Sequence, residues 1–218
     1  MPQNKNKNKN KNRNMKRIFI IILAINSFLC SGQDASDIII PSGFAALTFV
    51  AANMEIKEVA KEISQFRSKE FIINNLIGEV NEKDVKFETE SLASDDSGGL
   101  ISVAFNCSEL NKRGLLLAFF GNNRDINGNM GLAYGFRYVP LSEAQSLLNR
   151  IDAVKEKHEK YLHSNSDVNN VYLEHNDIKF VLYYDSSDKI RVFWNGFEVI
   201  WERTAFDRTK RRLNRWFE

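Results

Sequence analysis

The chain is poor in the residues that build covalently stabilised or metal-bound folds. Only two cysteines and three histidines occur among its 218 residues. Cys30 lies in an N-terminal segment that we expect to be removed, so the folded chain would hold the single thiol of Cys107 and no disulfide. Glycine and proline number 11 and 3, which excludes a collagenous chain and argues against a largely disordered one.

Motifs of common chemistries are missing as well. The sequence contains no glycine-rich phosphate-binding loop of the P-loop or dinucleotide type. Ser97 precedes two glycines, but it follows two aspartates instead of the glycine of a nucleophile elbow. His158 and His163 are five positions apart, which places them about 140° apart around a regular helix, so they cannot bind one zinc ion together. We therefore assign no catalytic residue and expect no cofactor.

An enzyme remains the alternative, because carboxylate pairs that hydrolyse their substrates are assembled from distant positions of a chain. The alternative is an exported hydrolase with dispersed acidic and histidine residues. It predicts a concave pocket that holds two or more carboxylates, or that gathers His158, His163 and His175.

The first 32 residues have the organisation of a secretory signal. Met15-Lys16-Arg17 precede an apolar run of about a dozen residues, and small residues around Cys30 follow it. The run is shorter than the roughly 20 residues that span a bilayer, so we predict cleavage and export to the periplasm or the medium. The mature chain, residues 33–218, would have no transmembrane span. The alternatives are a lipid anchor at Cys30, which bulky Leu29 disfavours, and a retained anchor.

Removing this leader reverses the sign of the protein's net charge. The full chain carries a net charge of +2, but seven of its 30 basic residues and none of its 28 acidic residues lie in the leader. The mature chain would therefore carry 23 basic and 28 acidic residues, a net charge of −5. Six of these basic residues lie at positions 203–218, which leaves the body, residues 33–202, with a net charge of −9. An acidic body with one short basic end argues against nucleic acid as a partner.

Hydrophobic periodicity predicts a single α+β domain over residues 33–218, with a largely antiparallel sheet and about three helices on one face of it. The first helix would start at an Asn53 cap and bury Ile63 and Phe66. A capping box of Ser142 and Gln145 would start the second helix. The third helix would run from a Thr204 cap to Phe217. Strands are expected at 85–89, 100–107, 114–120, 132–139, 171–174, 178–184, 189–194 and 197–201, whereas 71–77 is either strand or helix.

In the last third of the chain, alternating apolar and polar residues predict a meander with a well-defined buried face. Asn195-Gly196, between two alternating segments, is the dipeptide favoured by a type I′ hairpin turn. Trp194 and Trp201 have the parity of the buried set, while Tyr183 and Phe193 have the opposite parity. We expect a helix to cover that second face; the alternative is an aromatic platform for sugar or peptide.

The segment 121–131 reads as a polar loop with a weak resemblance to a calcium-binding loop. Asn123, Asp125 and Asn127 supply alternating oxygen atoms, and Gly128 follows them. However, the first position is an asparagine and the twelfth is Tyr134 instead of a bidentate glutamate. We expect a hairpin loop that turns at Asn127-Gly128, with those three residues as weak metal candidates only.

The closing helix carries the strongest functional signal. Its arginines recur at spacings that place four guanidinium groups on one side, with Phe206, Leu213, Trp216 and Phe217 on the other. The planar fork of a guanidinium binds carboxylate or phosphate at two points. We predict an exported, non-catalytic protein that binds a protein partner or an anionic envelope component through Arg208, Arg211, Arg212, Arg215 and Trp216. The alternatives are arginines that are solvated or paired internally, and a structural subunit of an envelope assembly.

Overall fold

A computed structural model describes residues 37–41, 58, 61–80, 84–94, 99–165 and 168–218 of the chain. The predicted leader, the Asn53 cap and the tip of the loop at 95–98 lie outside these residues.

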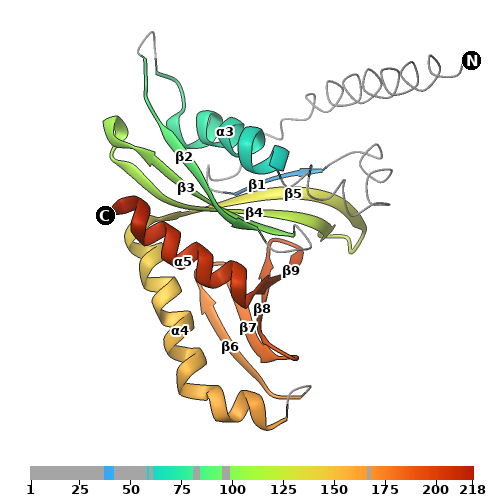
Figure 1. Cartoon of the computed structure of the whole chain (residues 1–218). Coiled ribbons are helices and arrows are strands. Elements are labelled where there is room, and N and C mark those ends of the chain that lie inside the picture. The colour runs from blue at the N-terminus through green and yellow to red at the C-terminus, as the bar shows by residue number, and fades with distance from the viewer. Residues whose placement is uncertain (1–36, 42–57, 59–60, 81–83, 95–98, 166–167) are drawn as a thin grey trace, which may run out of the picture.

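In the described part of the chain nine strands form one antiparallel sheet, so the predicted α+β class is confirmed. The order is β1-β5-β4-β9-β8-β7-β6, and β3 and then β2 branch from β4. Only one residue pair, Asn123 with Phe197, joins β4 to β9. The sheet therefore has two halves: an N-terminal half of β1 to β5 and a C-terminal half of β6 to β9 (Figure 1). The strands are β1 (Asp37–Pro41), β2 (Glu88–Ser94), β3 (Leu100–Cys107), β4 (Lys112–Arg124), β5 (Met130–Pro140), β6 (Asn170–His175), β7 (Ile178–Tyr184), β8 (Asp188–Trp194) and β9 (Phe197–Glu202).

The helices lie on both faces of the N-terminal half, so the expectation that they share one face was wrong. Helices α4 (Leu141–Ser164) and α5 (Arg203–Phe217) pack on one face and also cover the C-terminal half (Figure 1). The opposite face carries a helical segment made of η2 (Ile63–Arg67), α3 (Ser68–Phe71) and η3 (Ile72–Ile77). Strand β4 contributes side chains to the cores on both faces of the sheet, because successive side chains of a strand point to opposite faces. Leu115 and Leu117 join the core under α4 and α5, while Leu116 packs with Phe71 on the other side.

The helical segment before β2 is partly π-helical, and this changes which side chains are buried. Segment 71–77, which the sequence left open, is helical. Ile63 is buried as predicted, but Phe66 is 65% exposed. The sequence predicts buried residues three positions apart, at Ile63 and Phe66. Because a π-helix has wider turns, the buried side instead contains Ile63, Ser68, Ile72 and Leu76.

The hairpin of β4 and β5 extends well into the predicted polar loop. Strand pairing continues to Arg124 and Met130, so the loop contains only residues 125–129. Burial does not drive this extension, since most of its side chains are exposed. The extension is held by backbone pairing between β4 and β5. The hairpin of β8 and β9 supports it, because the Arg124 amide donates to the carbonyl of Gly196 at 2.9 Å.

The two long helices begin without the side-chain caps that the sequence suggests. Helix α4 begins at Leu141, directly after Pro140, so the predicted capping box of Ser142 and Gln145 was wrong. Helix α5 begins at Arg203, one residue before the expected Thr204 cap. At α4 the cap position is Pro140, which has a non-helical ψ of 149° and no side-chain oxygen that could cap the helix.

The predicted meander is confirmed, with one difference at its outer face. Asn195 and Gly196 have φ angles of 44° and 83°, as a type I′ turn requires. Trp194 and Trp201 are buried with the α4 and α5 layer. Tyr183 and Phe193 lie on the other face, where they are half-buried and no described helix covers them. The helix expected over this second face is therefore not found in the described part of the chain.

Candidate functional site

Helix α5 is held in place through its apolar side. Phe206 and Leu213 are fully buried in the larger core. Between them, the hydroxyl of buried Thr209 lies 2.6 Å from that of Ser102 in β3 and donates to the carbonyl of Ala205 at 2.8 Å. Together with Phe206 and Leu213, this buried contact with β3 holds one side of the helix against the sheet.

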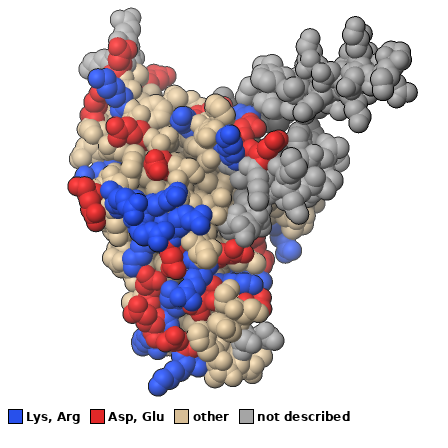
Figure 2. Space-filling model, viewed as in Figure 1, with Lys and Arg blue, Asp and Glu red and all other residues tan. Residues whose placement is uncertain are grey.

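The opposite side of α5 carries the predicted arginines, which we call the arginine stripe: Arg208, Arg211, Arg212 and Arg215. All four residues are exposed. Figure 2 shows a continuous patch of basic side chains on the face over α5, with acidic side chains at its margins.

Arg212 differs from the other members of the stripe because it binds the backbone of β2. Its Nη1 donates to the carbonyl of Leu92 at 2.9 Å and lies 3.5 Å from that of Ser91. The pairing of β2 with β3 shifts register between Ser91 and Ala93, so Leu92 is the extra residue of a β-bulge. Arg212 thus satisfies a carbonyl that the bulge leaves without a strand partner.

Arg208, Arg211 and Arg215, which we call the unpaired arginines, make no hydrogen bond or ion pair with any described residue. Two aspartates of α5 and the neighbouring helix α4 are engaged elsewhere. Asp207 lies 3.7 Å from Arg203, and Asp152 of α4 binds Lys210 at 2.5 Å. Internal pairing with the described carboxylates is therefore not what holds these three side chains.

Trp216 lies at the C-terminal end of the helix and is partly buried. It packs against the larger core and meets the ring of Phe217 edge-on, with 4.8 Å between the ring centroids. Part of the indole stays accessible beside the arginine stripe.

The loop of the weak metal candidates is a self-capped turn. Both oxygens of Asp125 accept hydrogen bonds from within the loop, with Oδ1 bound by the amides of Asn127 and Asn129 at 2.9 and 2.8 Å. The side-chain amide of Asn129 donates to Oδ2 at 2.9 Å, and this bond is the main reason that the pKa of Asp125 lies below its usual value. Asn123 instead donates from Nδ2 to the carbonyl of Asn195 at 2.8 Å. Among the described residues, no group of three or more His, Cys, Asp or Glu side chains is placed to hold a metal ion.

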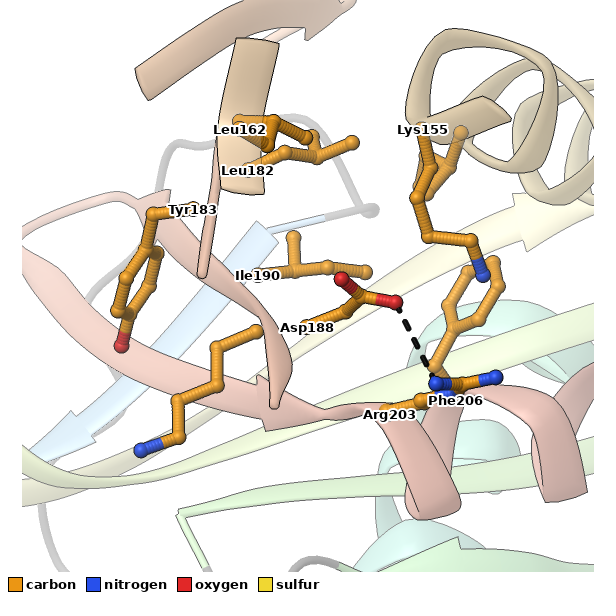
Figure 3. A pocket seen from close by; sticks show the side chains of 10 residues that line it. Lys155, Leu162, Leu182, Tyr183, Asp188, Ile190, Arg203 and Phe206 are labelled. Carbon is orange, nitrogen blue, oxygen red and sulfur yellow. Dashed lines mark ion pairs between the residues drawn. The ribbon is translucent and has the colours of Figure 1, made fainter. Parts of the chain in front are cut away.

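One cavity lies between α4, α5 and the C-terminal half of the sheet (Figure 3). Its volume is about 10 Å³, which leaves room for a single water molecule at most. Asp188 faces Arg203 across it with 3.6 Å between the charged atoms, and Lys155 lies over the ring of Phe206.

A larger cleft of about 260 Å³ opens where β5, the first turn of α4 and the turn after β6 meet. Arg137, Glu143 and His175 line it. His175 Nε2 lies 3.7 Å from Glu143 Oε2, while Arg137 Nη2 binds Asp177 Oδ1 at 2.7 Å. No signal in the sequence could have united these residues, because they come from a strand, a helix and a turn. No arginine of the stripe borders either cavity.

The three histidines lie in separate surroundings. His158 is half-buried on α4, His163 binds Asp188 at 3.0 Å and His175 lines the cleft.

Comparison with protein-family models, with curated proteins and with solved structures gave no match for this chain. None of the described helices combines the length and the apolarity that crossing a membrane demands.

Proposed function

We propose that this chain is an exported, non-catalytic binding protein that contacts a protein partner or an anionic envelope component through the arginine stripe of α5. The observation that carries the proposal is the set of three guanidinium groups without described partners on a helix whose other side is locked in the core. Because the helix is folded against the core before a partner binds, binding requires no ordering of its backbone.

The shape of the site supports a binding role. The stripe lies on the convex surface of a helix, and neither described cavity includes it. A convex array of forked cations suits a partner that lies along the helix better than a small substrate that must be enclosed. Export is supported by the organisation of residues 15–32, and it remains a proposal of the sequence.

The test compares two charge-reversed variants of the full chain. Arg211→Glu combined with Arg215→Glu removes the centre of the stripe, while Lys157→Glu with Lys160→Glu makes the same charge change on exposed positions of α4. We expect the first variant to lose at least about tenfold in affinity for vesicles of anionic lipid or for detergent extracts of the envelope, and the second to bind normally. Equal binding by the wild type and the stripe variant would refute the proposal.

The hydrolase alternative is favoured by one observation only, the cleft that holds Glu143 and His175. It contains one carboxylate and one histidine in its lining, fewer than that alternative predicts. Glu143→Gln tests it: a hydrolytic activity found with chromogenic esters or glycosides must disappear in this variant, whose exposed side chain has little effect on folding.

The structural-subunit alternative cannot be tested by deleting residues 204–218. That deletion would remove Phe206 and Leu213 from the core, so loss of assembly and loss of fold would coincide. Charge reversal of the unpaired arginines leaves the core intact. It therefore separates a surface contact from a structural contribution.

A further inference from the structure

The partner of the stripe must be bound by the guanidinium groups themselves. Amphipathic helices that lie on membranes insert their apolar side between lipids. Here Ala205, Phe206 and Leu213 are 3%, 1% and 0% exposed within the protein's own core. Inserting that side would require the domain to open, so a partner must contact the exposed side of α5, on which the arginine stripe lies.

The positive surface is also narrow. In Figure 2 the basic patch over α5 is bordered by acidic side chains. Asp207 precedes the stripe with 49% of its side chain exposed, and exposed Glu90 lies on the neighbouring strand β2. A broad anionic surface, such as a bilayer or a nucleic-acid duplex, would bring its own charges against these carboxylates. A single chain laid along α5 can follow the arginines and contact fewer of these carboxylates than a broad surface would.

The spacing of the unpaired arginines suits carboxylates of a polypeptide. Along a helix axis that rises 1.5 Å per residue, Arg208, Arg211 and Arg215 stand about 4.5 and about 6 Å apart. Alternate side chains of an extended peptide point to the same side about 6.6–6.8 Å apart, within reach of flexible arginine side chains. Each carboxylate can accept two parallel hydrogen bonds from one guanidinium.

We propose that the unpaired arginines bind one acidic polypeptide segment of a partner protein, laid along the exposed side of α5. This inference rests on the proposed function and names the partner's chemistry. Electrostatic pairs at an exposed surface are screened by ions, so the affinity decreases as the salt concentration increases.

The experiment measures the binding of four probes to the full chain by fluorescence anisotropy or sedimentation. The probes are a labelled peptide of about twelve residues with alternating glutamate and threonine, its glutamine counterpart, inorganic polyphosphate, and vesicles of phosphatidylglycerol and phosphatidylcholine. We expect the glutamate peptide to bind more tightly than the other three. Binding should weaken at least about tenfold in the Arg211→Glu, Arg215→Glu variant and stay unchanged in the Lys157→Glu, Lys160→Glu variant.

The outcomes separate this inference from the proposed function. If vesicles or polyphosphate bind in a stripe-dependent way at least as tightly as the glutamate peptide, the inference is overturned and the proposed function stands. If no probe binds in a stripe-dependent way and envelope extracts do not either, both are overturned. An Arg211→Gln, Arg215→Gln variant with a wild-type unfolding midpoint gives the same comparison without added negative charge.

Discussion

The guanidinium of Arg212 binds backbone oxygens, whereas those of the three unpaired arginines have no partner among the described residues. Its hydrogen bond to the Leu92 carbonyl is 2.9 Å long and joins α5 to the bulge of β2. A charged donor on a carbonyl that the sheet leaves unpaired stabilises the fold, although exposure of the side chain reduces the gain. We therefore expect Arg212 to contribute mainly to stability, whereas the unpaired arginines are the ones proposed to bind the partner.

We expect Arg212→Ala to lower the free energy of unfolding by about 1 kcal/mol, because the Leu92 carbonyl loses its partner. Arg208→Ala is the matched control on the same exposed side, and it should change that free energy by less than about 0.5 kcal/mol. Urea unfolding followed by tryptophan fluorescence measures both values. Equal effects of the two substitutions would contradict the distinction between Arg212 and Arg208.

The sequence predicts the stripe but not this division within it. Spacing places the four arginines on one side of a helix, and exposure of all four agrees with that. The partner of Arg212 lies 120 positions away, at a bulge that no local pattern indicates. The cleft of Arg137, Glu143 and His175 is invisible for the same reason, since tertiary packing alone brings these residues together.

At the scale of elements, the start of α4 provides a test of how the chain enters the helix. Ser142 makes no capping hydrogen bond, because the helix has already begun at Leu141 after Pro140. Ser142→Ala should therefore change the free energy of unfolding by less than about 0.5 kcal/mol, whereas losing a true N-cap costs about 1 kcal/mol. Leu147→Ala, in the buried side of the same helix, should cost about 2–5 kcal/mol and shows that the measurement responds. A loss of 1 kcal/mol or more for Ser142→Ala would contradict this and show that Ser142 caps the helix.

Elements with local signals were predicted well, and those that depend on distant partners were not. Asn195-Gly196 specifies its turn through backbone preferences, and the C-terminal meander followed from alternation. By contrast, the end of β4 pairs through its backbone with exposed side chains, which leaves no hydrophobic pattern to detect. The sequence does carry a signal for the helical layer on the second face. The run 115–120 is apolar at every position, which is typical of a strand buried on both faces.

At the scale of the molecule, the central strands join two apolar layers into one structure. β3, β4 and β5 send alternate side chains into the core beneath α4 and α5 and into the core beneath the segment from Ile63 to Ile77. Opening one layer would expose the strands that form the floor of the other. The acidic body and the basic helix are therefore parts of one folding unit, and the stripe is presented on a rigid surface.

This architecture predicts a single cooperative unfolding transition, which two probes in different layers can check. Trp194 and Trp201 report on the layer of α4 and α5, and the buried thiol of Cys107 reports on the other. In a Cys30→Ser variant, where Cys107 is the only thiol, the urea midpoints of tryptophan fluorescence and of thiol labelling should coincide. Labelling of Cys107 at lower urea than the fluorescence change would mean that the helical layer over β3 opens by itself. Coincident midpoints that shift together in a Leu147→Ala variant would show that the two layers unfold as one.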